Sequence, residues 1–289
     1  MYPASFDYLA PATLEEALGI LSERGADAKV LAGGQSLIPL MKLRFASPAA
    51  VVDINRLSGL DEISDAQSGL RIGALVRHKT CERSQLLRGR YRLLGDAAAQ
   101  IADPLVRNRG TVCGSLAHAD PQGDWGAIML AARAQVVARS ASGTRTIPID
   151  DLFKGPFTTS LAPDEIVTEV MIPDPGARAS GTYLKLERKV GDYATAAVAV
   201  QLSLDNGTIG RAGIALTGVG PNNIRATDAE EFLRGSETTD DVIAEAARRA
   251  AAAAEPQSDI RGTAEYKRNV VRVFTERGLR TALEAALGA

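Results

Sequence analysis

Two glycine-rich segments place the strongest constraint on how this chain folds. The first, LAGGQSL, covers residues 31–37 and follows a short apolar run that is typical of a strand. The second, GTVCGSLAHADP, covers residues 110–121 and follows a helical pattern. Glycine lets the backbone approach a ligand closely, and consecutive amide groups can form a concave site for an anion. We therefore expect both segments to be loops, and two such loops suggest a ligand with two phosphate groups.

Hydroxyl side chains accompany both segments. Ser36 in the first, and Thr111 and Ser115 in the second, could each donate a hydrogen bond to a phosphate oxygen. Neither segment matches a common nucleotide fingerprint, because no GxGxxG motif opens a helix and no GxxxxGK[ST] motif is present. The sequence therefore argues against a Rossmann or P-loop nucleotide site.

His118, near the end of the second segment, admits several interpretations. With Asp120 and Asp124 it could bind a metal, but divalent sites usually need three or four supported ligands, and the chain has only two histidines. With Ser115 and Asp120 it could form a catalytic triad, but three members so close in one loop rarely reach relay geometry. A structural loop histidine and a histidine placed beside a cofactor remain open.

The cysteine count excludes one class of redox centre. The chain has two cysteines, Cys81 and Cys113, and neither lies in a CxxC motif. An iron–sulfur cluster normally takes four cysteines, or two cysteines and two histidines, so we expect none here. So few cysteines favour a reducing, cytoplasmic setting. A net charge of −2 gives no reason to expect nucleic acid, and no apolar run approaches the ~20 residues of a membrane span.

The order of helical and strand patterns predicts an α+β chain in two parts. The segment PDPGARASG at residues 173–181 has the composition of a linker. Beyond it, three strand-like runs are followed by alanine-rich helices, which predicts a three-stranded antiparallel sheet with helices on one face. These runs cover residues 182–188, 194–204 and 208–218, and the helices cover 226–234, 238–254 and 263–287.

The paired motifs AGGQSLIPLMK and GTVCGSLAHADPQGD resemble the FAD-binding medium subunit of the molybdenum hydroxylases, the family of aerobic carbon monoxide dehydrogenase and xanthine dehydrogenase. The similarity continues through LFKGPFTTSLAPDEIVTEVMIP and YLKLERKVGDYATAAVAV, and so covers nearly the whole chain. It implies a vanillyl-alcohol-oxidase (PCMH)-type FAD-binding domain at residues 1–175, made of two α/β subdomains at about 1–55 and 56–175. A C-terminal α+β domain with a three-stranded antiparallel sheet and helices would cover residues 176–289.

The resemblance also implies which residues hold FAD, without a covalent bond. The first segment would bind the pyrophosphate through backbone N–H groups, and the second would complete the phosphate and ribityl contacts. Asp124 would accept hydrogen bonds from FAD hydroxyl groups, while Ile101 and either Ile166 or Val167 would pack against the cofactor. The implied cofactor-binding residues are Ala32, Gly33, Gly34, Gln35, Ser36, Leu37, Ile101, Thr111, Gly114, Ser115, His118, Asp120, Asp124, Ile166, Val167, Lys185 and Tyr193.

No residue is expected to act as a catalytic acid or base. The resemblance instead implies that His118 lies near the reactive edge of the flavin, that Lys185 stabilises the reduced flavin by its charge, and that Tyr193 covers one face of the ring. The plainer interpretation of Lys185 and Tyr193 is an ordinary strand with an exposed lysine and a packed tyrosine. Cys113 could look like a covalent flavin anchor, but the resemblance implies non-covalent binding.

As a function, the resemblance implies an electron-transfer subunit. A large partner subunit would carry the molybdenum cofactor and a small one the [2Fe–2S] clusters, in a heterotrimer that would be doubled into a dimer of heterotrimers. FAD in this chain would pass electrons to an external acceptor. Two other functions stay open, a self-contained FAD-dependent oxidase or dehydrogenase and a scaffold that has lost its cofactor. The sequence names neither the substrate nor the acceptor.

Overall fold

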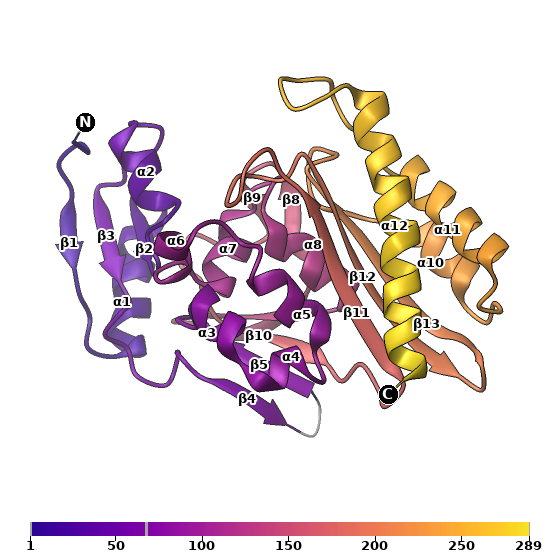
Figure 1. Cartoon of the computed structure of the whole chain (residues 1–289). Helices are drawn as coiled ribbons and strands as arrows, with labels where there is room; N and C mark the ends of the chain where they lie inside the picture. Colours follow the sequence, from indigo (N-terminus) through magenta and orange to yellow (C-terminus); the bar gives the residue numbers. More distant parts are fainter. Residues whose placement is uncertain (1, 67–68, 289) are drawn as a thin grey trace.

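The computed structural model describes residues 2–66 and 69–288 and arranges them in three consecutive parts (Figure 1). The first part is a small parallel sheet with strand order β1-β3-β2. It lies at one end of the molecule, and the C-terminal helices lie at the other. Its elements are β1 (Asp7–Leu9), α1 (Leu14–Arg24), η1 (Gly25–Asp27), β2 (Ala28–Leu31), α2 (Leu37–Lys42) and β3 (Ala50–Asp53).

Helix α1 shows how local sequence sets an element of this part. The Thr13 side chain accepts a hydrogen bond from the Glu16 backbone N–H at 3.1 Å, which satisfies a free donor of the first turn. Leu18 and Leu21 lie on the buried face. The helix ends at Gly25, whose φ of 55° favours glycine.

The second part is a five-stranded antiparallel sheet with strand order β4-β5-β10-β6-β7. The long strand β10 is its centre, and five of its eight residues are buried. The strands are β4 (Ile63–Ala66), β5 (Gly69–Gly73), β6 (Gln135–Ser140), β7 (Gly143–Pro148) and β10 (Ile166–Pro173). The helices are α3 (His78–Arg83), α4 (Gln85–Arg88), α5 (Arg92–Ala98), α6 (Pro104–Arg107), α7 (Val112–His118), α8 (Asp124–Ala131) and α9 (Ile149–Leu152), and β8 (Phe153–Gly155) pairs with β9 (Thr158–Thr159).

The third part is the predicted antiparallel sheet, with three long strands and a two-residue edge strand. The turn between the second and third long strands places Asn206 and Gly207 at φ values of 49° and 88°, as a tight hairpin requires. The strands are β11 (Ala179–Leu186), β12 (Ala196–Asp205), β13 (Thr208–Thr217) and β14 (Ile224–Arg225). The helices are α10 (Thr227–Leu233), α11 (Asp240–Ala252) and α12 (Ala264–Leu287).

The predicted linker at 173–181 is shorter than expected. Pro173 still belongs to β10, and Ala179 already pairs with Ser203 in the next sheet. A Cβ at Gly181 would lie 2.5 Å from the Val200 carbonyl oxygen, so the small residues of this segment serve close strand packing as well as flexibility. Only residues 174–178 connect the two sheets.

The C-terminal sheet contributes to two hydrophobic cores. Along β12, Ala197 and Ala199 face the preceding parts of the chain, whereas Val198 and Val200 face the C-terminal helices. Figure 1 shows the sheet between helices α5 and α8 on one side and α10–α12 on the other. Gly213 allows a close approach of the sheet to α8, because a Cβ there would lie 2.0 Å from the Ala131 carbonyl oxygen.

Candidate functional site

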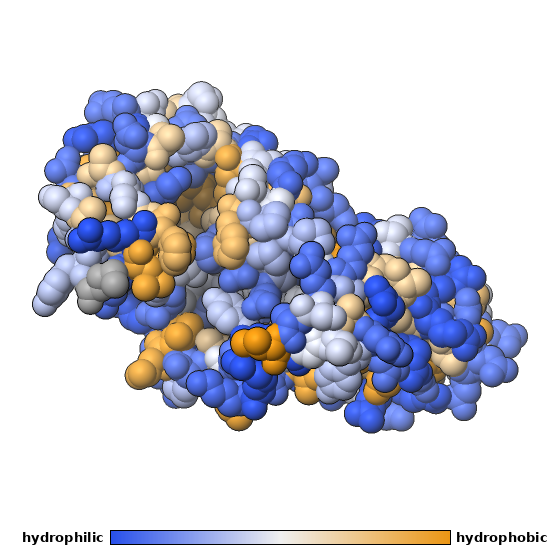
Figure 2. Space-filling view, turned by 90° about the horizontal axis from the view of Figure 1, so that it is seen from above, coloured by the Kyte–Doolittle hydropathy of each residue, from blue (hydrophilic) through white to orange (hydrophobic). Residues whose placement is uncertain are grey.

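The two glycine-rich segments, far apart in sequence, touch each other in the structure. The first lies between β2 and α2, and the second follows α6. A Cβ at Gly33 would lie 2.4 Å from the Arg109 carbonyl oxygen and 2.7 Å from the Gly110 Cα, so no larger residue fits. Seen from above, the surface is hollowed between the first part and the middle of the molecule, with hydrophobic residues at the rim (Figure 2).

Polar side chains that sequence reasoning missed fix this contact. Asn55 donates to the Ala32 carbonyl oxygen at 2.8 Å, and its own side-chain oxygen accepts from Arg77 at 2.6 Å. Arg77 also donates to the Arg109 carbonyl oxygen at 2.5 Å. Asp53 holds the Asn55 side chain from the end of β3. The one available signal was polar residues directly after an apolar strand, in VVDIN.

The first segment presents a row of free amides. Within residues 2–66 and 69–288, the backbone N–H groups of residues 33–37 donate no hydrogen bond to another protein atom. Gly34 has a φ of 72°, which turns the chain into α2, and Gln35 is exposed while Ser36 and Leu37 are half-buried. Unpaired neighbouring amides suit a phosphate group, so this segment fits the FAD pyrophosphate.

The prediction that the second segment is a loop was wrong, because most of it forms helix α7. The Thr111 hydroxyl oxygen accepts from the Gly114 N–H at 3.1 Å and so caps the helix. Thr111 is buried, whereas Gly114 is exposed and Ser115 is half-buried. Of the predicted contacts in this segment, Gly114 and Ser115 therefore lie on one accessible helix face, which also carries the half-buried His118, whereas Thr111 is used as the buried cap.

Neither cysteine is available for chemistry. Cys81 and Cys113 are both buried and free. Burial raises the pKa of the Cys81 thiol to about 12 and raises that of Cys113 as well. Because the thiolate is the reactive form, Cys113 is unsuited to anchor a flavin covalently.

His78, which sequence reasoning missed, connects the second glycine-rich segment to α8 through hydrogen bonds. It is 3 % exposed, and its Nδ1 accepts from the Trp125 indole N–H at 3.0 Å. Its backbone N–H donates to the Gly110 carbonyl oxygen at 3.0 Å, and a Cβ at Gly110 would lie 2.6 Å from the His78 Nε2. Burial, with the charges of Arg107 and Arg77, lowers the pKa of His78 to about 4.

This buried imidazole predicts a loss of stability in acid. The unfolded chain protonates His78 near its ordinary pKa of 6.5, but the folded protein does so only near pH 4. Folding is therefore opposed progressively as pH falls through this window, by up to ~3 kcal/mol. Urea unfolding at a series of pH values should show a shallower loss for His78→Asn than for the wild type. The half-buried His118→Asn variant should keep the wild-type slope more closely, and equal slopes in all three proteins would refute the assignment.

Asp124, Lys185 and Tyr183 meet where the second and third parts of the structure join. Asp124 begins α8 and is 9 % exposed. Its Oδ1 accepts from the Tyr183 hydroxyl at 2.6 Å, and its Oδ2 accepts from the Lys185 ammonium at 3.1 Å. Lys185 also donates to the Gln100 carbonyl oxygen at 3.2 Å. Burial raises the pKa of Asp124, and the Lys185 charge opposes that rise.

This arrangement changes how two predicted residues are understood. Asp124 and Lys185 were expected as separate contacts to the cofactor, but they form an ion pair, and the Lys185 side chain is only 2 % exposed. The plainer interpretation of an exposed lysine is thus wrong. Sequence reasoning missed Tyr183 because its segment has only the pattern of an ordinary strand. In the structure, burial and the neighbouring Asp124 carboxylate raise the pKa of Tyr183 well above its usual value.

A second group surrounds Asp120, just after α7. Burial and the Asp120 carboxylate raise the pKa of Tyr193 to about 12, although half of that residue is exposed. Arg261 donates to the Tyr193 carbonyl oxygen at 3.1 Å and holds this segment. The His118 ring lies 5.2 Å from the Phe157 ring, centroid to centroid, and burial lowers the pKa of His118. The structure thus brings two of the predicted flavin-tuning residues near one carboxylate.

The three residues predicted to pack against FAD through apolar contacts are buried. Ile101, Ile166 and Val167 are 6 %, 2 % and 7 % exposed and belong to the first hydrophobic core. Within the described residues, no group of three histidine, cysteine or carboxylate side chains could hold a metal ion, so the metal interpretation of His118 gains no support.

Two protein-family models together match almost the full length. The FAD binding domain of molybdopterin dehydrogenases matches residues 4–175, and the CO dehydrogenase flavoprotein C-terminal domain matches residues 181–282. The chain belongs to the molybdopterin dehydrogenase flavoproteins. The predicted family and α+β fold are confirmed, and the chain is an oxidoreductase subunit with an FAD-binding domain.

Relatives of this family align over the whole chain. The carbon monoxide dehydrogenase medium chain of Hydrogenophaga pseudoflava is 41% identical over 98% of both chains. The 6-hydroxypseudooxynicotine dehydrogenase complex subunit alpha of Paenarthrobacter nicotinovorans is 39% identical over 99% of this chain and 97% of that one.

Solved structures of the family agree with the fold. The structure of carbon monoxide dehydrogenase from Hydrogenophaga pseudoflava matches with a TM-score of 0.95 at 41% identity and covers 99% of both chains. That of quinoline 2-oxidoreductase from Pseudomonas putida 86 matches with a TM-score of 0.92 at 34% identity and covers 99% of this chain and 100% of that one. Among the described residues, no helix is long and apolar enough to cross a membrane.

Proposed function

We propose that this chain is the electron-transfer subunit of a molybdenum hydroxylase complex. It accepts electrons from [2Fe–2S] clusters on a small partner subunit, and a large partner subunit carries the molybdenum cofactor. The observation that carries the proposal is the row of free amides at residues 33–37, held against Gly110 by a contact that only glycine permits. Relatives named as the medium chain or subunit of dehydrogenase complexes support the assembly.

The chain's own residues bind and orient the cofactor. FAD, when bound, supplies the redox chemistry, and the protein contributes position and electrostatics. The amides of residues 33–37 hold the pyrophosphate, and the accessible face of α7 adds Ser115. Asp124 keeps free lone pairs on both carboxylate oxygens, so it can accept from FAD hydroxyl groups while Lys185 and Tyr183 hold it in place. Tyr193 and His118 border the flavin.

The division of labour follows the two domains, which we place at residues 1–175 and 176–289. The first carries the phosphate-binding segments, and the second supplies Lys185 and Tyr193. We propose a dimer of heterotrimers that passes its electrons to an external acceptor. A self-contained FAD oxidase is less favoured because the relatives are named as subunits of complexes.

The test uses the chain produced together with its two partner subunits. We expect the purified complex to show the visible absorption bands of oxidised flavin, and acid to release FAD from it. After FAD is stripped, reduction of the iron–sulfur clusters by carbon monoxide, an N-heteroaromatic compound, a purine or an aldehyde should persist. Reduction of an artificial electron acceptor should stop and return with added FAD. A complex without FAD, or acceptor reduction that is independent of FAD, would contradict the proposal.

A further inference from the structure

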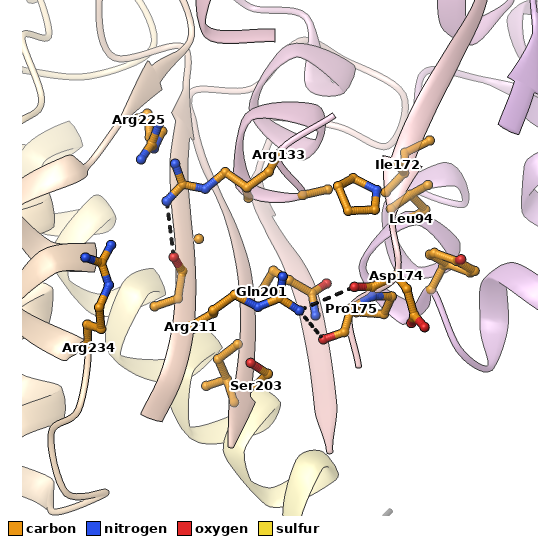
Figure 3. A pocket seen from close by; sticks show the side chains of 17 residues that line it. Leu94, Arg133, Ile172, Asp174, Pro175, Gln201, Ser203, Arg211, Arg225 and Arg234 are labelled. Atoms are coloured by element: carbon orange, nitrogen blue, oxygen red, sulfur yellow. Dashed lines mark hydrogen bonds between the residues drawn. The ribbon is translucent and has the colours of Figure 1, made fainter. Parts of the chain in front are cut away.

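A second cavity lies at the joint between the two domains, with a volume of about 330 Å³ (Figure 3). Its walls come from the residues that follow α8, from the end of β10 with the connecting segment, and from β12 and β13. Known small-molecule sites occupy roughly 300–1,000 Å³ and are frequent at domain interfaces, so this volume suits a small ligand.

The cavity is separate from the proposed flavin site. Asp124 begins α8, whereas Arg133, which lines the cavity, lies just beyond its end. A helix of eight residues spans about 12 Å, so the two sites lie at opposite ends of α8.

The residues that line the cavity include four arginines and one acidic residue, Asp174. Arg133 and Arg225 share the buried carboxylate of Glu230, at 2.6 and 2.8 Å. Two guanidinium groups thus face one carboxylate here, although Arg225 also contacts a second, more exposed acid.

The other two arginines, Arg211 and Arg234, form no ion pair among the described residues, although the charge of Arg211 acts on the nearby Asp174 carboxylate. Arg211 donates to the carbonyl oxygens of Asp174 and Pro175, at 3.3 and 3.0 Å, which orients the side chain. Arg234 forms no ion pair within this part of the chain and is exposed. Asp174 itself is bound by Arg90. The cavity therefore carries excess positive charge.

The rest of the lining is largely apolar. Figure 3 shows Arg225 and Arg234 on one side of the cavity and Leu94, Ile172 and Pro175 on the other. Such a wall accepts a ring or a short hydrocarbon body, and a planar guanidinium group matches a carboxylate with two parallel hydrogen bonds.

We propose that this cavity binds a small organic acid with one carboxylate on an apolar, ring-sized body. The carboxylate contacts Arg211, and the ring lies against Leu94 and Ile172. The charge of Arg234 on the other side of the cavity adds to the attraction for the anion. The site depends on the joint between the domains and not on the flavin, so it is independent of the proposed function.

The test is calorimetric titration of the FAD-loaded full-length chain with 2-naphthoate. We expect binding of one molecule per chain, and at least about tenfold weaker binding of the uncharged 2-naphthamide. Arg211→Gln and Arg234→Gln should each weaken 2-naphthoate binding by about tenfold. Arg248→Gln, at an arginine 62% exposed on α11, should keep the wild-type affinity.

Ser203→Trp fills the cavity from β12 and should abolish binding. Circular dichroism checks that every variant is folded. If a variant at a less exposed residue does not fold, the result for Arg234→Gln, at an exposed residue, decides the test. The proposal is overturned by an absence of binding, by equal affinity for the amide, or by binding that survives Ser203→Trp. It is also overturned if excess FAD displaces the probe, because 2-naphthoate would then occupy the flavin site. Equal binding to the chain with and without FAD supports it.

Discussion

Gly33→Ala should yield a folded protein that binds FAD about 10- to 100-fold more weakly than the wild type. The added methyl group would lie 2.4 Å from the Arg109 carbonyl oxygen, so the two glycine-rich segments must separate. Overpacking of this kind typically introduces about 1–3 kcal/mol of strain, and a loss of affinity of about 10- to 100-fold lies within that range. The measurement is a fluorescence titration of flavin-depleted protein with FAD.

Gly19→Ala provides the matched control. Nothing lies within 4 Å of a Cβ at this position in α1, so FAD affinity should not change. Alanine also favours the helix over glycine by up to ~1 kcal/mol, so thermal stability should rise slightly. Wild-type affinity in Gly33→Ala would show that the contact between the two segments is not needed for binding.

Lys185→Met should lower the free energy of unfolding by about 3–5 kcal/mol, because it leaves the buried Asp124 carboxylate without its charged partner. The pair is almost completely inaccessible, with side chains 2% and 9% exposed, so solvent screens it little. Urea unfolding measures the loss, and the FAD content of the purified variant shows whether the site is lost with it.

The double variant Asp124→Asn/Lys185→Met should recover part of this stability, because it removes both charges of the buried pair and leaves only the less buried Glu187 without Lys185. Arg280→Gln is the control, since its pair with Asp240 is exposed and solvent screens it, so the change in stability should be small. If Lys185→Met is no more destabilising than Arg280→Gln, the buried pair does not hold the domain joint together.

Much of the fold was predictable because local signals agreed with the final packing. The C-terminal strands alternate inward and outward residues, and Asn206–Gly207 marks their tight turn. The second glycine-rich segment was predicted wrongly because its glycines outweighed a weaker signal, the capping threonine Thr111. That residue begins a helix that tolerates Gly114.

The proposed site was only half accessible to sequence reasoning. The glycine-rich segments could be recognised because the residues that form each of them are adjacent in the sequence. Asn55, Arg77 and His78 could not, because each acts on backbone or side chains that only the fold brings near. Tyr183 was missed for the same reason, since its partner Asp124 lies 59 residues away.

The sheet of β11–β13 closes two cores at once, and this limits how the chain can be recombined. A hybrid that joins the FAD domain of one relative to the C-terminal domain of another would match the linker but mismatch the inner face of the sheet. Its partners there are α5 and α8, which belong to the first domain. The natural unit of exchange is therefore the C-terminal domain together with those two helices, and a crossover placed at the linker alone divides a packed core.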